Sequence, residues 1–164
     1  MAVTDFFLKL DGIKGESTDS KHKEELEIES FSWGATNSGS FSNAPGAGGG
    51  TGKVNFQDVH FTKKADKSSA DIMFHCASGK HIKQANLTVR KAGEDQQEYY
   101  KIKLTDVLVS SYQSGGSAGS SLIPTDQFSL NFAKIEFSYA PQDAKGKLGS
   151  PARAGWDLKS NKKV

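Results

Sequence analysis

The sequence predicts a mainly β fold with a single helix, and two observations support this. Short runs rich in aromatic and β-branched residues alternate apolar with polar positions, and clusters of Gly, Ser, Asn and Asp separate these runs, which is typical of strands and turns. One segment instead repeats its apolar residues with the period of a helix. At 164 residues, the chain has the length of one ordinary domain with one hydrophobic core.

The predicted strands cover residues 6–13, 25–35, 53–63, 85–91, 98–111 and 127–139. In four of them the apolar positions change face in mid-strand; in the last, the series from Phe128 to Phe132 gives way to one of opposite parity from Ile135 to Tyr139. Such a change requires a bulge, or burial of first one face and then the other. Strands bent around a closed or nearly closed barrel, or passing between two packed sheets, would account for it, as would a flank facing another subunit.

The predicted helix begins at Lys67 and ends at Ser78. Its apolar residues recur at i, i+3, i+4 and i+7, the spacing of one helical face: Ala70, Met73, Phe74 and Ala77. Ser68 with Asp71 three residues later resembles a capping box, and Gly79 resembles a C-terminal stop.

Composition excludes several classes of protein. Lys and Arg number 21 against 19 Asp and Glu, a balance that argues against a nucleic-acid partner. No stretch approaches the roughly 20 consecutive apolar residues of a membrane-spanning helix, so no membrane insertion is expected. The first residues lack the basic leader and apolar core of a signal peptide. A single cysteine, Cys76, excludes an intrachain disulfide.

We expect residues 1–164 to form one domain with two mobile loops and a frayed tail. Residues 37–52 are rich in Gly, Ser and Ala, and residues 113–121 are almost wholly Gly and Ser. Such segments cannot bury enough side chain to hold one conformation. Residues 159–164 are basic and polar, as is common for a chain end that frays.

Two segments resemble a nucleotide-binding and a catalytic motif, but the residues and predicted elements around them do not fit either motif. Gly52 and Lys53 end a Gly-rich stretch as in a phosphate-binding loop, but Ala47 and Val54 stand where that loop needs Gly and Ser or Thr, and a strand follows instead of a helix. Residues 115–119 match the G-x-S-x-G pattern of a hydrolase, yet no histidine follows Ser117. A hydrolase built on Ser117 would lose its activity in Ser117→Ala.

The sequence offers no clear metal or cofactor site. The candidate soft ligands are His60, His75, Cys76 and His81. Neighbouring helical residues such as His75 and Cys76 point about 100° apart, and the spacing matches no zinc signature. We therefore expect a half-buried Cys76, surface histidines, no catalytic residue, no cofactor and no metal.

The strand sequences themselves carry the most specific signal. In order along the chain they include F-S-W-G at 31–34, G-K-V-N-F-Q-D-V-H at 52–60, A-D-K-S-S-A-D-I-M-F-H-C-A-S-G-K-H at 65–81, L-T-V-R-K-A-G at 87–93, L-T-D-V-L-V-S-S at 104–111, L-N-F-A-K-I-E-F-S-Y at 130–139 and G-W-D-L at 155–158. Together these blocks resemble the hemolysin-coregulated protein (Hcp) family, the tube protein of the bacterial type VI secretion system. The resemblance covers nearly the whole chain.

The resemblance implies a compact two-sheet β-barrel flanked by one α-helix, and a structural protein rather than an enzyme. It implies homohexameric rings that stack into a tube, which a contractile sheath ejects with a spike protein of the valine-glycine repeat family at its tip. It also implies that effector proteins travel in the lumen, with the ring as their receptor or chaperone. Such a protein resides in the bacterial cytoplasm before firing and is secreted to the medium or a target cell without a signal peptide.

The resemblance also suggests roles for particular residues. Ser32 alternates with Phe31 and Trp33, which are expected to point into the core, so Ser32 is a candidate contact for the lumen and its effectors, or else an ordinary solvent-facing serine. Glycines of the Gly-rich loop are candidates for an inter-ring element: Gly46, Gly48, Gly49, Gly50 and Gly52. The alternative is a monomeric β-sandwich binding module that uses Trp33 or Trp156 to stack on a ligand such as a carbohydrate.

Overall fold

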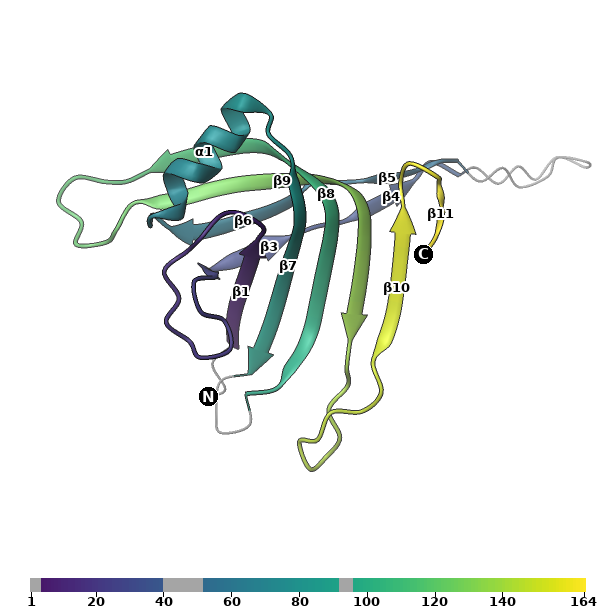
Figure 1. The fold of residues 1–164 in the computed structure, drawn as a ribbon. Helices are drawn as coiled ribbons and strands as arrows, with labels where there is room; N and C mark the ends of the chain where they lie inside the picture. The colour runs from purple at the N-terminus through teal and green to yellow at the C-terminus, as the bar shows by residue number, and fades with distance from the viewer. Residues whose placement is uncertain (1–3, 40–51, 92–95) are drawn as a thin grey trace, which may run out of the picture.

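The computed structural model describes residues 4–39, 52–91 and 96–164, which form strands and, within these ranges, one helix (Figure 1). The strands are β1 (Thr4–Leu10), β2 (Leu26–Ile28), β3 (Ser30–Ser32), β4 (Ala35–Asn37), β5 (Val54–Phe56), β6 (Val59–Lys64), β7 (Ile82–Lys91), β8 (Glu98–Gly115), β9 (Thr125–Tyr139), β10 (Ala152–Asp157) and β11 (Lys162–Lys163), and the helix is α1 (Ser68–Ser78). The predicted mainly β fold with one flanking helix is confirmed.

The main sheet curls so that the strands at its two ends, β2 and β3, are consecutive in the chain, although no ladder joins them. Strand β1 pairs with β7, β7 with β8, β8 with β9, β9 with β6, and β6 with β3, all antiparallel. Strand β2, which pairs with β1, is separated from β3 by Glu29 alone, and the Glu29 N–H donates to the Thr62 carbonyl at 2.8 Å. The β2–β3 segment therefore turns a corner between the two faces of a barrel.

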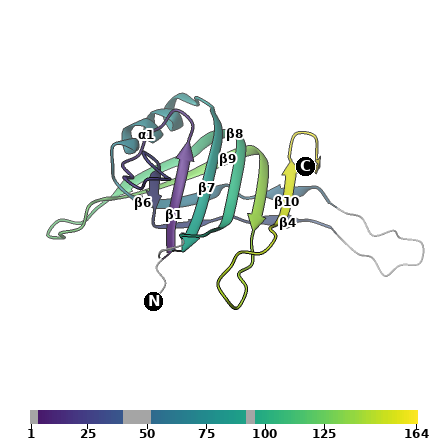
Figure 2. The ribbon, with the colours of Figure 1, turned by 60° about the horizontal axis from the view of Figure 1, so that its bottom comes forward.

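The remaining strands extend this barrel on one side (Figure 2). Strand β10 pairs with the second half of β9, and β11 pairs with β10. Strands β4 and β5 form a separate two-stranded ladder. Lys162 and Lys163 of the predicted frayed tail thus lie in a strand, as do residues 113–115 of the predicted mobile loop.

The mid-strand changes of apolar face have local structural causes. In β8, Asp106 adopts a left-handed conformation (φ 54°), so Leu104 and Val107 are both buried although residues three apart in a regular strand face opposite sides. Their partners Ile135 and Phe132 are buried in the same core. The predicted segments 25–35 and 53–63 change face where each divides into separate strands. Bulges and corners, rather than burial of both faces, explain these patterns in the protomer.

Helix α1 lies where the sequence predicts it, but the face that packs on the barrel is not the face that carries the regularly spaced apolar residues. Its buried residues are Ser68, Ile72 and His75. The predicted apolar face is exposed, and we call it the helix stripe: Ala70, Met73, Phe74 and Ala77. Ile72 fills the core position, and the Nδ1 of His75 lies 2.8 Å from the Asp71 carbonyl one turn earlier. The four residues share one face of the helix, as the spacing predicts, and this face points away from the core.

The ends of α1 agree with the sequence only in part. Ser68 and Asp71 form no capping box; instead Asp66 Oδ1 accepts from the Ser68 N–H at 2.9 Å. At the other end, Gly79 adopts φ 70° and its N–H donates to the His75 carbonyl, as the predicted stop requires.

A fully buried ion pair fastens the start of α1 to the barrel. The Lys63 ammonium donates to Asp126 Oδ2 and to Asp66 Oδ1, each at 2.9 Å, and the Tyr112 hydroxyl donates to Asp126 Oδ1 at 3.0 Å. The side chains of Lys63 and Asp126 are both 0% exposed. Burial alone would raise the pKa of the Asp126 carboxyl, but hydrogen bonds from Ser69 and Lys63 and the lysine charge hold that pKa below its usual range.

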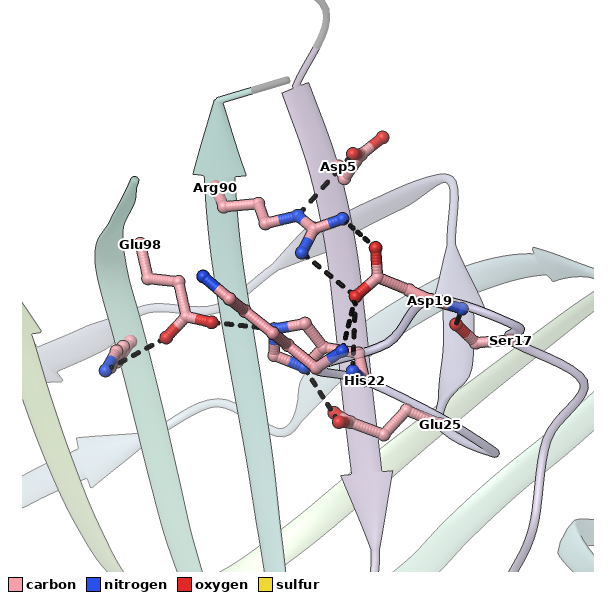
Figure 3. A network of polar contacts seen from close by, with 9 residues as sticks. Asp5, Ser17, Asp19, His22, Glu25, Arg90 and Glu98 are labelled. Atoms are coloured by element: carbon pink, nitrogen blue, oxygen red, sulfur yellow. Dashed lines mark hydrogen bonds and ion pairs between the residues drawn. The ribbon is translucent and has the colours of Figure 1, made fainter. Parts of the chain in front are cut away.

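A second polar network joins the loop after β1 to strands β7 and β8 (Figure 3). Arg90 donates to both carboxylate oxygens of Asp19, and its guanidinium lies over the Phe7 ring at 4.8 Å. The His22 ring stacks on Phe7, and its two nitrogens each lie 2.7 Å from a carboxylate oxygen, of Glu25 and of Glu98. His22 is buried, and so is His75, for which the expectation of a surface position was wrong.

We expect Asp126→Asn to lower the free energy of unfolding by about 3 kcal/mol, because it removes the charge that compensates the buried Lys63 ammonium. Urea unfolding would measure the change. Glu27→Gln, at an exposed carboxylate on β2, is the matched control and should stay within about 0.5 kcal/mol. A similar loss in both variants would contradict the assigned role of the buried pair.

The Asp19–Arg90 pair predicts a pH dependence of stability at acid pH. Hydrogen bonding to Arg90, aided by the Lys21 N–H, lowers the pKa of Asp19 from 3.8 to about 2. A lowered pKa means that the ionised carboxylate stabilises the fold above pH 3.8 and that this contribution is lost as the pH falls through about 2.

The measurement is the difference in urea midpoint between the parent protein and Asp19→Asn, followed from pH 7 down to about 2. We expect this difference to narrow below pH 3.8. Asp11→Asn is the control, since the Asp11 side chain forms no hydrogen bond or ion pair within the described ranges. A difference that stays constant with pH would show that the Asp19 carboxylate charge is not what stabilises the fold.

Candidate assembly surfaces

One outer face of the barrel is polar, and its two central cross-strand rows contain no Asp, Glu, Lys or Arg. It is formed by β3, β6, β9 and the second half of β8. The register places these residues side by side in two rows, which we call the polar face: Ser30, Thr62, Gln127 and Gln113 in one, and Ser32, His60, Ser129 and Ser111 in the other.

Aromatic side chains beneath the polar face explain why it faces outward. The row between the two polar rows runs Phe31, Phe61, Phe128 and Tyr112, and these residues pack into or against the core. The rings of Phe61 and Phe128 stack with centroids 5.2 Å apart. Because side chains alternate across a strand, burial of this row places the neighbouring polar rows on the outer face. Ser129 is nevertheless buried within its row, where its hydroxyl hydrogen-bonds to those of Ser110 and Ser111.

Ser32 lies on the polar face as the alternation predicts. It is exposed, while Phe31 and Trp33 pack against the core. The register sets it opposite His60 of β6, whose other neighbour is Ser129 of β9. The position of Ser32 is therefore confirmed, and its role as a lumen contact stays a prediction. The sequence signal for the other members of the face was the same alternation in residues 53–63 and 127–139.

The sheet that carries the polar face has an unpaired edge on each side within the described part of the chain. Strand β7 pairs with β8 only as far as Val107, so the flank of β8 opposite β9 has no ladder partner from Leu108 to Gly115. Strand β3 pairs with β6 on one flank and with no described strand on the other. Unpaired edges are where a sheet can accept a strand of another chain.

Exposed large apolar side chains lie in neighbouring pairs at two places, apart from Tyr139 and Val164. On the helix stripe, Met73 is 50% and Phe74 is 56% exposed. On the loop that joins β8 to β9, Leu122 is 77% and Ile123 is 56% exposed. Exposed apolar groups at such density mark interaction sites more often than scattered surface residues do.

The Gly-rich loop is described only at its ends. Gly46, Gly48, Gly49 and Gly50 lie outside the described residues. Gly52 precedes β5, and a Cβ at this position would lie 2.3 Å from the Ser38 Oγ, so only glycine fits without movement of the Ser38 segment. Its assignment to an inter-ring element stays a prediction.

The structure brings together none of the catalytic or metal-binding candidates. Across residues 4–39, 52–91 and 96–164, no three His, Cys, Asp or Glu side chains are placed to hold a metal ion. Cys76 is half-buried, as expected, and His60 and His81 are exposed. Ser117 lies in the exposed β8–β9 loop. Within the same ranges, no helix is long and apolar enough to cross a membrane.

Neither tryptophan offers a fully exposed face for ligand stacking. Trp33 is half-buried; its Nε1 donates to the Tyr100 hydroxyl at 2.9 Å and its ring lies 5.7 Å from that of Phe137. Trp156 is half-buried against the core. Their packing gives both residues a structural role in the protomer.

Comparisons with known proteins agree with the strand sequences and the fold. Residues 7–139 match the family described as type VI secretion system effector, Hcp. Protein hcp1 of Pseudomonas aeruginosa is 50% identical over 163 residues, which cover 98% of each chain. A solved type six secretion system protein is 33% identical with a TM-score of 0.92, over 99% of this chain and 100% of the other. Hcp1 from Salmonella typhimurium is 35% identical with a TM-score of 0.82, over 100% of both chains. This chain belongs to the Hcp family of type VI secretion system proteins.

Proposed function

We propose that this Hcp protein is the tube subunit, that it closes into six-membered rings, and that the polar face lines the lumen of the stacked rings. The observation that carries the proposal is a polar sheet face whose two central rows contain no Asp, Glu, Lys or Arg and which is bounded by two unpaired edges. Edge-to-edge contact between β8 of one subunit and β3 of the next would continue the sheet around a ring.

The surface chemistry supports this orientation. Serine, threonine and glutamine side chains keep a wall hydrated, so a folded protein can lie against it without tight apolar adhesion. The exposed apolar residues lie elsewhere, on the helix stripe and the β8–β9 loop. In a ring they are available for contacts between subunits or with other tube components.

The finer features of the system are part of the same proposal. The ring acts as receptor and chaperone for effector proteins, with Ser32 in the wall that they touch. The spike protein and the contractile sheath are the further partners, and the tube carries no enzymatic activity. The protein is held in the bacterial cytoplasm before firing and then reaches the medium or a target cell.

Light scattering coupled to size exclusion tests the ring. We expect a mass of about 106 kDa, six times the 17.6 kDa of one chain, with ring-shaped particles in negative stain. A 17.6 kDa monomer at high concentration would contradict the ring and favour the monomeric binding module with Trp33 or Trp156 at its ligand site.

Ser32→Arg tests the lumen wall. We expect the ring mass to be unchanged and effector capture to fall at least about tenfold, because each ring would place bulky charges on the polar face. Ser78→Arg, at the exposed end of α1, is the control and should retain capture. Unchanged capture by Ser32→Arg would remove Ser32 from the effector surface.

A further inference from the structure

The β8–β9 loop ends in an apolar tip that has no acceptor within its own protomer. Both views show the hairpin projecting from the barrel on the side away from β4 and β5 (Figures 1 and 2). Residues 115–124 contain no charged side chain, although 24% of the chain is charged. Leu122 is 77% exposed, the highest exposure among the large apolar residues of the described chain. Water contact with this leucine is unfavourable unless another molecule covers it.

A partly apolar recess lies between β5 and the end of β10, on the side of the barrel away from the hairpin (Figures 1 and 2). It has a volume of about 430 Å³, and its apolar wall consists of Val54 and Phe56 of β5 with Trp156 and Leu158 at the end of β10. Lys53, Asn55 and Asn161 complete the lining. The Phe56 ring lies 6.0 Å from that of Phe132, which ends the first half of β9. Strand β9 spans from the hairpin to this point, so about 25 Å separates tip and recess at the usual rise per residue. The tip of one protomer therefore cannot fill its own recess.

The sizes of the two sites also match. A leucine side chain is small enough for a recess of about 430 Å³. Burial of the exposed Leu122 side chain against Val54, Phe56, Trp156 and Leu158 would remove apolar surface from water on both copies.

We propose that the Leu122 tip of one copy of this chain docks into the Val54–Phe56–Trp156–Leu158 recess of the next copy. The contact is heterologous, joining two different surfaces on opposite sides of the barrel, so it repeats from copy to copy as a tube requires. The inference rests on the proposed function, because it takes a second tube subunit as the occupant.

A disulfide trap tests the contact in the full-length chain. In a Cys76→Ser background, the pair Leu122→Cys with Asn161→Cys places one thiol on the tip and one at the rim of the recess. Mild oxidation should give a ladder of multimers on a non-reducing denaturing gel, which a reductant collapses. Each single-cysteine variant can form dimers at most. A double variant that gives no product beyond dimers would overturn the proposal.

A charge substitution separates this contact from the ring itself. Leu122→Asp should weaken association between copies at least about tenfold by sedimentation velocity, because a carboxylate would enter an apolar recess. Ser121→Asp adds the same charge beside it and should change association less than about twofold, since no apolar contact is lost. Equal effects of the two variants would overturn the docking of Leu122. A parent protein that is monomeric would instead contradict the proposed function, whatever the variants do.

Discussion

The architecture depends on the long antiparallel ladder between β8 and β9. This ladder extends from Tyr100 opposite Tyr139 to Gly115 opposite Thr125, and both strands change their buried face near Asp106. Before that point the pair belongs to the face shared with β7, and after it to the face shared with β6. One hairpin thus supplies both walls of the barrel, and each further strand is added to one of its halves. Loss of the left-handed bend would put either Leu104 or Val107 in water.

The sequence predicted most of the strands and the polar position of Ser32 because alternation records burial directly. It did not predict β10 and β11, which lie beyond the last predicted strand. It could not predict the packing face of α1. The period of the apolar residues shows that they share one face of the helix. It does not show whether that face packs on the core of the protomer or meets another molecule. The signal that did exist was Ile72, the one strongly apolar β-branched residue on the opposite side of the helix. The pairing of β2 with β1 and of β3 with β6 likewise depends on contacts distant in sequence.

Buried polar groups specify this fold in places where apolar packing would be ambiguous. The Lys63–Asp126 pair sits beneath the start of α1, where an apolar pair of similar volume would tolerate several helix positions. Arg90, His22 and their carboxylates fix the loop after β1 across the outside of β7 and β8. Neither cluster was visible in the sequence, because the contacts that define them join distant residues: Lys63 and Asp126 are 63 residues apart, Asp19 and Arg90 are 71 apart, and His22 and Glu98 are 76 apart.

The composition of the polar face has a consequence for the forces that act across it. Hydroxyl and amide groups interact over hydrogen-bond distances, whereas fixed charges act over about 8 Å at physiological ionic strength and are weakened by added salt. A protein held against Ser32, Thr62, Gln127 and Ser111 is therefore held by contacts that salt screens little. The affinity of these two rows for a bound protein would therefore depend little on salt concentration, and it would depend little on the isoelectric point of that protein.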